Sequence, residues 1–147
     1  MVMQLAIGTV LICVNIVISA YAAWGLELFI ARYARLLVPN RRRPHFVLAM
    51  AGVSLLAQLI VTVGVWLWAL TFWWVGALPD FEHSLYFALV CYSTLGLGDI
   101  VLPDQWRILS GMTAANGFLS FGIVTALMIE TLRHVRFAHG SAQAPRT

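Results

Sequence analysis

The stretch Ser93-Thr94-Leu95-Gly96-Leu97-Gly98-Asp99 decides how this chain is interpreted. It closes a charge-free segment, 84–98, that is too short to cross a bilayer, because a spanning helix needs about 20 residues. The segment begins like a helix and ends in two glycines separated by one residue. Irregular backbone is tolerated at membrane depth only where it is buried in protein or lines an aqueous path. The pattern therefore predicts a re-entrant element, a short helix that enters the membrane and returns as a loop.

Three longer stretches, 1–26, 46–79 and 108–129, contain no Asp, Glu, Arg, Lys or His. The chain has 147 residues, of which 61% are hydrophobic and 10% charged, whereas a soluble domain carries about 25% charged residues. A chain of this length cannot bury so much apolar surface in a water-soluble core. The expected fold is an all-α membrane protein with three transmembrane helices plus a re-entrant pore helix and filter loop.

These stretches divide the chain into an N-terminal transmembrane helix at 1–37, a basic cytoplasmic connection at 38–45, a pore unit at 46–130 and a short cytoplasmic tail at 131–147. The uncharged start of the sequence favours a retained first helix over a cleaved signal peptide. Four elements are expected within the pore unit: an outer helix at 46–78, a pore helix at 81–93, a filter at 94–99 and an inner helix at 105–130.

The arginines predict the orientation. Eight of the nine lie in the connection between the first two spans or after the third span, whereas the region between the second and third spans is acidic. The positive-inside rule places the arginine-rich side in the cytoplasm, with the N-terminus outside and the C-terminus inside. The expected location is the cell (inner) membrane, as a multi-pass protein. The arginines are too few and too localised to indicate a nucleic-acid partner.

The glycine pair gives the loop its expected chemistry. Gly96 and Gly98 permit backbone angles that other residues avoid, so successive carbonyls can point to one side. A ring of such carbonyls can replace the hydration shell of a cation. One chain supplies only one edge of a ring, so several chains must surround the axis.

Thr94-Leu95-Gly96-Leu97-Gly98-Asp99 resembles the selectivity filter of the potassium channel superfamily, whose pattern is Thr-Val-Gly-Tyr-Gly-Asp. The order of outer helix, acidic turret, pore helix, filter and inner helix is also similar, and residues 117–126 resemble the inner helix of small bacterial potassium channels. The resemblance covers roughly 46–130 and leaves the first helix outside. It implies a homotetramer, in which each chain has three further copies of itself and the lipid bilayer as partners, and no cofactor besides permeant K⁺ ions.

The resemblance also assigns residues. It implies K⁺ coordination by the carbonyls of Thr94, Leu95, Gly96 and Leu97, with Gly98 completing the ion-coordinating filter. Asp99 is expected behind the filter as a support. Its partner is expected to be Tyr86, through a hydrogen bond, because the family often places a bonding Trp 13 residues before this Asp. A solvated turn residue is the alternative for Asp99.

Two residues depart from the family pattern. Leu95 replaces Val, which matters little because the carbonyl is the ligand. Leu97 replaces a Tyr or Phe whose ring packs against the pore helix, and the corresponding pore-helix position is Phe87. We expect Leu97 and Phe87 to form an apolar support that leaves no polar group unpaired. Selectivity for K⁺ over Na⁺ depends on the geometry of the carbonyls around this support.

Polar and small residues in the long helices are further candidates. Asn116 either lines the cavity or bonds to a neighbouring helix. Asn15 and Ser19 are candidates for bonds to a neighbouring helix. The four tryptophans 66, 68, 73 and 74 are expected in an interfacial aromatic belt. The remaining cavity and gating candidates are Gly117 as a hinge and Phe118, Phe121 and Thr125 as lining residues.

The favoured function is a pore-loop cation channel selective for potassium. Two alternatives stay open: a weakly selective monovalent cation channel, and a non-conducting membrane scaffold or accessory subunit. A membrane enzyme has no support, because the histidines are scattered and no nucleophile–base pair is visible in the sequence.

Overall fold

The computed structural model describes the backbone of residues 1–37 and 44–140, and side chains at 1–25, 28 and 50–133. Four helices follow in order: α1 (Val2–Leu37), α2 (Pro44–Trp74), α3 (Phe81–Tyr92) and α4 (Arg107–Gly140). Stretches of α1, α2 and α4 are long and apolar enough to cross a membrane. The expected all-α class, with three spanning helices, is confirmed.

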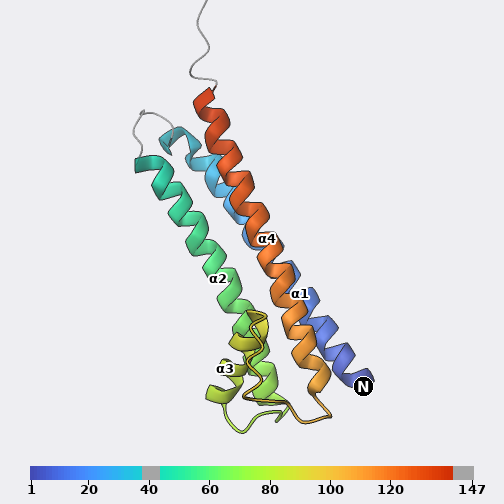
Figure 1. Cartoon of the computed structure of the whole chain (residues 1–147). Coiled ribbons are helices and arrows are strands. Elements are labelled where there is room, and N and C mark those ends of the chain that lie inside the picture. The colour runs from blue at the N-terminus through green and yellow to red at the C-terminus, as the bar shows by residue number, and fades with distance from the viewer. Residues whose placement is uncertain (38–43, 141–147) are drawn as a thin grey trace, which may run out of the picture.

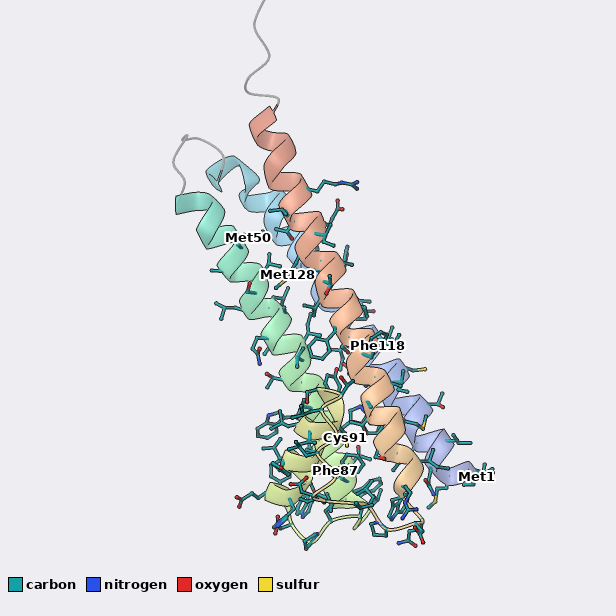
Figure 2. All side chains as sticks on the ribbon, in the orientation of Figure 1. Met1, Met50, Phe87, Cys91, Phe118 and Met128 are labelled. Atoms are coloured by element: carbon teal, nitrogen blue, oxygen red, sulfur yellow. The ribbon has the colours of Figure 1, made fainter. Side chains whose placement is uncertain are left out.

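The short helix α3 enters the bundle from one end and does not cross it. Figure 1 shows α3 and the loop after it beside the end of α2 and the start of α4, and Figure 2 labels Phe87 and Cys91 at this end of the bundle. At Gly76 the chain turns out of α2 with a φ of 64°, a left-handed angle that glycine adopts without penalty. The chain between α2 and α4 therefore enters the bundle as α3 and returns as a loop to the same end of the bundle.

Some helix ends differ from the expected ones. The outer helix ends at Trp74, earlier than residue 78, and the inner helix continues to Gly140 instead of ending at 130, so the expected tail at 131–147 begins as helix. Pro44 is the first residue of α2 and not a residue of the loop before it. A proline is well placed there, because the first helical N–H has no partner within the helix. The predicted basic connection at 38–45 lies mostly outside the described residues.

The core surrounds α3. Its buried members on α3 are Phe87, Ala88 and Tyr92, and these pack with residues of α2 and of the segment that leads into α4. The ring of Phe87 meets that of Phe72 edge to face, with centroids 5.2 Å apart. Burial of aromatic rings on both sides fixes α3 relative to α2. The other core residues come from α2, the turn before α3, the segment before α4 and α4 itself: Val65, Trp68, Ala69, Phe72, Ala77, Leu102, Trp106 and Leu109.

Trp68 belongs to this core. Its side chain is fully buried, with no exposed surface, whereas Trp73 and Trp74 are 52% and 85% exposed. The expected placement of Trp68 in an interfacial belt is therefore wrong. The reason lies in the face of α2: Trp68 shares its face with Phe72, one turn further on, and that face packs against α3.

The N-terminal end of α1 is joined to the start of α4. The side-chain carbonyl of Gln4 accepts a hydrogen bond of 3.0 Å from the backbone N–H of Ile108, in the first turn of α4. One turn further along, Gly8 leaves room for the side chain of Met112. Gln4 is buried, so α1 caps a neighbouring helix that has no acidic residue in its own first turn.

Candidate functional site

The loop after α3 is placed by a well-capped helix. Asp80 precedes α3 with an extended backbone, and its carboxylate accepts a hydrogen bond of 2.8 Å from the backbone N–H of His83. This bond, together with the His83 ring nitrogen, also 2.8 Å away, lowers the pKa of Asp80 below its usual value. Glu82 lies in the first turn, where the positive end of the helix dipole favours an acid.

Four successive amides of the loop turn back onto the end of α3. Ser93 donates to the carbonyl of Leu89, and Thr94 donates to that of Cys91. The amides of Leu95 and Gly96 donate to the carbonyl of Val90, at 3.1 and 3.2 Å.

These four bonds decide where the loop carbonyls point. The described peptides are all trans, and in a trans peptide the N–H and the preceding C=O point in opposite directions. The carbonyls of Ser93, Thr94 and Leu95 therefore point away from α3, on one side of the loop.

Alternate residues of the loop have left-handed backbone angles. Thr94, Gly96 and Gly98 have φ values of 61°, 57° and 77°. Nothing lies within 4 Å of the place where a Cβ would stand on either glycine, so the backbone angle and not lack of space requires glycine there. Thr94 adopts this angle despite its branched side chain, a conformation that costs about 1–3 kcal/mol and is typical of functional sites.

The hydrogen bond expected between Tyr86 and Asp99 is present. The Tyr86 hydroxyl donates to the Asp99 carboxylate over 2.6 Å, linking the middle of α3 to the far end of the loop. This bond lowers the pKa of Asp99 and raises that of Tyr86, because the hydroxyl proton stabilises the carboxylate charge. The alternative of a purely solvated Asp99 is thus not what the structure shows. The loop is tied to α3 at both of its ends.

Leu97 and Phe87 differ in their surroundings. Phe87 is buried against Phe72 of α2, whereas Leu97 is 58% exposed in the single chain, as is Leu95 at 64%. The apolar side chains at positions 95 and 97 therefore leave large surfaces uncovered within one chain. The expected support of Leu97 by Phe87 stays a prediction.

Helix α4 has two distinct faces. Phe118, Phe121 and Thr125 share an exposed face, and Phe118 is 72% exposed. The opposite face is buried and carries Asn116, which is 1% exposed. Asn116 therefore lies away from the face that could line a cavity, and neither its Nδ2 nor its Oδ1 has a hydrogen-bond partner among the described residues.

Gly117 brings α4 against the backbone of α3. A Cβ at this position would collide with the carbonyl of Tyr92, lying 2.7 Å from the carbonyl carbon and 3.0 Å from the Cα. The absence of a side chain thus lets α4 touch the last turn of α3, one residue before Ser93. This close approach gives Gly117 a packing role, and the hinge expected for it stays a prediction.

The side chain of Tyr92 joins three helices, a feature that sequence reasoning did not single out. Its hydroxyl accepts a bond of 2.8 Å from Asn15 Nδ2 of α1 and lies 2.7 Å from Ser120 Oγ of α4. Gly64 of α2 supplies the space beside them. The cross-helix bond expected for Asn15 is confirmed, whereas Ser19 donates to the Asn15 carbonyl of its own helix. Apolar sequence around a tyrosine was the one signal that could have pointed to this cluster.

Comparison with known proteins adds one finding. No curated protein and no solved structure matches this chain. A family model described as "Ion channel" matches residues 60–134, which is 75 of the 147 residues and includes α3, the loop after it and most of α4. Three long apolar helices, a short re-entrant helix and a loop with carbonyls on one side agree with this match. The chain belongs to the ion channel family and is a multi-pass membrane protein, not an enzyme.

Proposed function

We propose that this protein is a potassium-selective channel, in which four copies surround an axis lined by the loop 94–99. The observation that carries the proposal is the direction of the loop carbonyls, turned away from α3 by the amide bonds to Val90 and Cys91. Carbonyl oxygens aligned on one side can replace the water around a dehydrated cation. The ligands would be the carbonyls of Thr94, Leu95, Gly96 and Leu97.

A single chain leaves this loop incomplete. Residues 93–99 are exposed, and the leucines at 95 and 97 present large apolar surfaces. A cation held by one strand would keep most of its coordination open, so a closed ring needs further copies. The exposed face of α4 carries Phe118, Phe121 and Thr125. This face fits the wall of a cavity that continues the pore from the ring of carbonyls.

The geometry of the loop end bears on selectivity. Filters that distinguish K⁺ from Na⁺ hold their carbonyls at a defined spacing or field strength. Here the Tyr86–Asp99 bond and the four amide bonds restrain the loop at both ends, which favours a defined ring. The exposed Leu97 favours the second candidate, a weakly selective cation channel.

Orientation follows from charge. We propose that the loop opens to the outside, with the acidic segment around Asp80 and Asp99, and that the C-terminus lies in the cytoplasm of a cell with this protein in its inner membrane. The arginine distribution supports this orientation.

The decisive experiment compares K⁺ flux from proteoliposomes containing wild type, Gly96→Ala or Gly52→Ala. Gly96 has a φ of 57°, and an alanine at a left-handed angle costs about 1–2 kcal/mol, or about 4–8 kcal/mol over four copies. We expect flux to fall at least about a hundredfold, because each 1.4 kcal/mol changes a population about tenfold.

Gly52 is the matched control, since it lies in α2 with open space around it. Equal K⁺ flux from Gly96→Ala and wild type, or no flux from wild type, would overturn the proposal that the loop 94–99 lines a pore. Reversal potentials in mixed K⁺ and Na⁺ then separate the two candidates: a strong K⁺ preference supports the first, and near-equal permeability supports the second.

A further inference from the structure

We infer that Asn15 of α1 is a positioning residue for the filter, acting through the hydroxyl of Tyr92; this inference rests on the proposed channel function. The first helix is then a working part of the pore and not only an anchor. The family match begins at residue 60, so nothing in the matched region assigns this role to Asn15.

The cluster around the Tyr92 hydroxyl is buried. Asn15 and Tyr92 are each 1% exposed, and Ser120 is 3% exposed. The buried tyrosine hydroxyl receives one bond from α1 and exchanges one with α4. Gly64 closes the cluster from α2: a Cβ there would lie 2.7 Å from the Tyr92 ring carbon Cζ and 2.8 Å from Asn15 Nδ2. All four helices thus meet at one side chain.

Tyr92 stands directly before the filter in the chain. It is the last residue of α3, followed by the cap Ser93 and the first filter residue, Thr94. Its backbone lies against Gly117 and its hydroxyl against Asn15, so both ends of the residue are held. A change in the tilt of this residue moves the carbonyls of Val90 and Cys91, to which the filter amides bond.

Helix α1 is fixed at a second point. Gln4 accepts the amide of Ile108, and Gly8 accommodates Met112, so α1 cannot slide along α4 without losing these contacts. Asn15 therefore reaches Tyr92 from a helix that is itself held in register. Because α1 is held in place, Asn15 can fix the position of the Tyr92 hydroxyl. On a helix free to move, Asn15 would shift together with Tyr92 and could not restrain it.

The experiment measures the K⁺/Na⁺ permeability ratio from reversal potentials of the purified full-length channel in planar bilayers. Asn15→Leu, Tyr92→Phe, the double variant and the control Ser19→Ala are compared with wild type. Ser19 is equally buried, lies one turn along α1 and bonds only to its own helix.

We expect Asn15→Leu to lower the ratio between about 3-fold and about 16-fold, and Tyr92→Phe, which also removes the bond to Ser120, to lower it at least as much. This range corresponds to the about 0.6–1.7 kcal/mol measured for hydrogen bonds inside membrane bundles, at about 1.4 kcal/mol per tenfold. The double variant should match Tyr92→Phe alone, because Asn15 acts through the hydroxyl that Tyr92→Phe already removes. Ser19→Ala should leave the ratio unchanged.

Three outcomes would overturn the inference. A selective wild type with an unchanged ratio in Asn15→Leu removes the role of Asn15 and leaves the channel intact. Equal loss in Ser19→Ala and Asn15→Leu means that general packing of α1 is responsible. A wild type without current overturns the proposed function itself.

If Asn15→Leu carries no current, amide hydrogen exchange of the peptide containing Thr94, Leu95 and Gly96 decides. Faster exchange with an unchanged oligomer and melting temperature supports the inference, because the filter amides have loosened alone. Loss of the oligomer or a lower melting temperature shows a merely structural role and overturns it.

Discussion

Replacing Gly117 with alanine tests how closely α4 must approach the end of α3. The new Cβ would lie 2.7 Å from the carbonyl carbon of Tyr92, whereas non-bonded carbons prefer about 3.5–4.0 Å. The carbonyl oxygen of Tyr92 lies closer still, so the backbone of Tyr92 must retreat by at least about 0.8–1.3 Å, the difference between these carbon–carbon distances. A backbone cannot yield as the end of a flexible side chain does, so the shift passes to Thr94 and the filter.

The expected cost is that of overpacking a core, about 1–3 kcal/mol per chain. For a chain of this length, each kcal/mol lowers the melting temperature by about 2–4 °C. Thermal unfolding of the purified protein in detergent measures this loss, and reversal potentials measure the accompanying fall in the K⁺/Na⁺ permeability ratio. Gly122→Ala is the matched control, because it lies on the same helix with nothing within 4 Å of its Cβ position. A helical alanine there should stabilise the protein by about 0.5–1 kcal/mol.

The result also separates packing from hinge bending. If Gly117 serves as a hinge, alanine stiffens α4, so the melting temperature rises and only the opening of the channel changes. If it serves as a contact, the melting temperature falls and selectivity changes. A Gly117→Ala protein with wild-type stability and selectivity would refute the packing argument.

Two further substitutions test the supports around the loop. Tyr86→Phe removes the hydroxyl that lowers the pKa of Asp99, so that pKa should rise. The Asp99 carboxylate contributes to stability above its ordinary pKa, and this contribution is lost as the pH falls through the lowered pKa. Acid should therefore inhibit the current at a higher pH in Tyr86→Phe than in wild type. Identical acid titrations of the current in the two proteins would contradict this. Gln4→Ala removes the acceptor for the Ile108 amide, and should destabilise the protein by about 0.5–2 kcal/mol in thermal unfolding, as for other lost helix caps. Gln58→Ala, at an exposed position of α2, is its control, and equal melting temperatures would refute the capping role.

Features that depend on neighbouring residues along the chain could be predicted from the sequence. The charge-free runs gave the three spans, because bilayer thickness sets a minimum length for an apolar helix. The resemblance to the potassium channel filter implied the hydrogen bond between Tyr86 and Asp99, which the structure contains. In each case the physical cause lies within one short segment.

Features that depend on which helix faces which could not be predicted. Tryptophan is typical of an interfacial belt, and Trp68 belongs to the core only because it faces α3. The sequence allows Asn116 either to line the cavity or to bond to a neighbouring helix. Its position on the buried face of α4 follows from the packing of that helix. The importance of Tyr92 depends on residues of three other helices, which no local pattern connects.

The bonds of the first helix have a consequence for biogenesis. Asn15 pairs with a residue 77 positions later, and Gln4 with one 104 positions later. Chains are made from the N-terminus, so α1 enters the membrane while both of its partners are still unsynthesised. During that interval the side-chain amides of Gln4 and Asn15 lack their final partners. We therefore expect the insertion machinery to hold the newly inserted first helix until the rest of the chain is made.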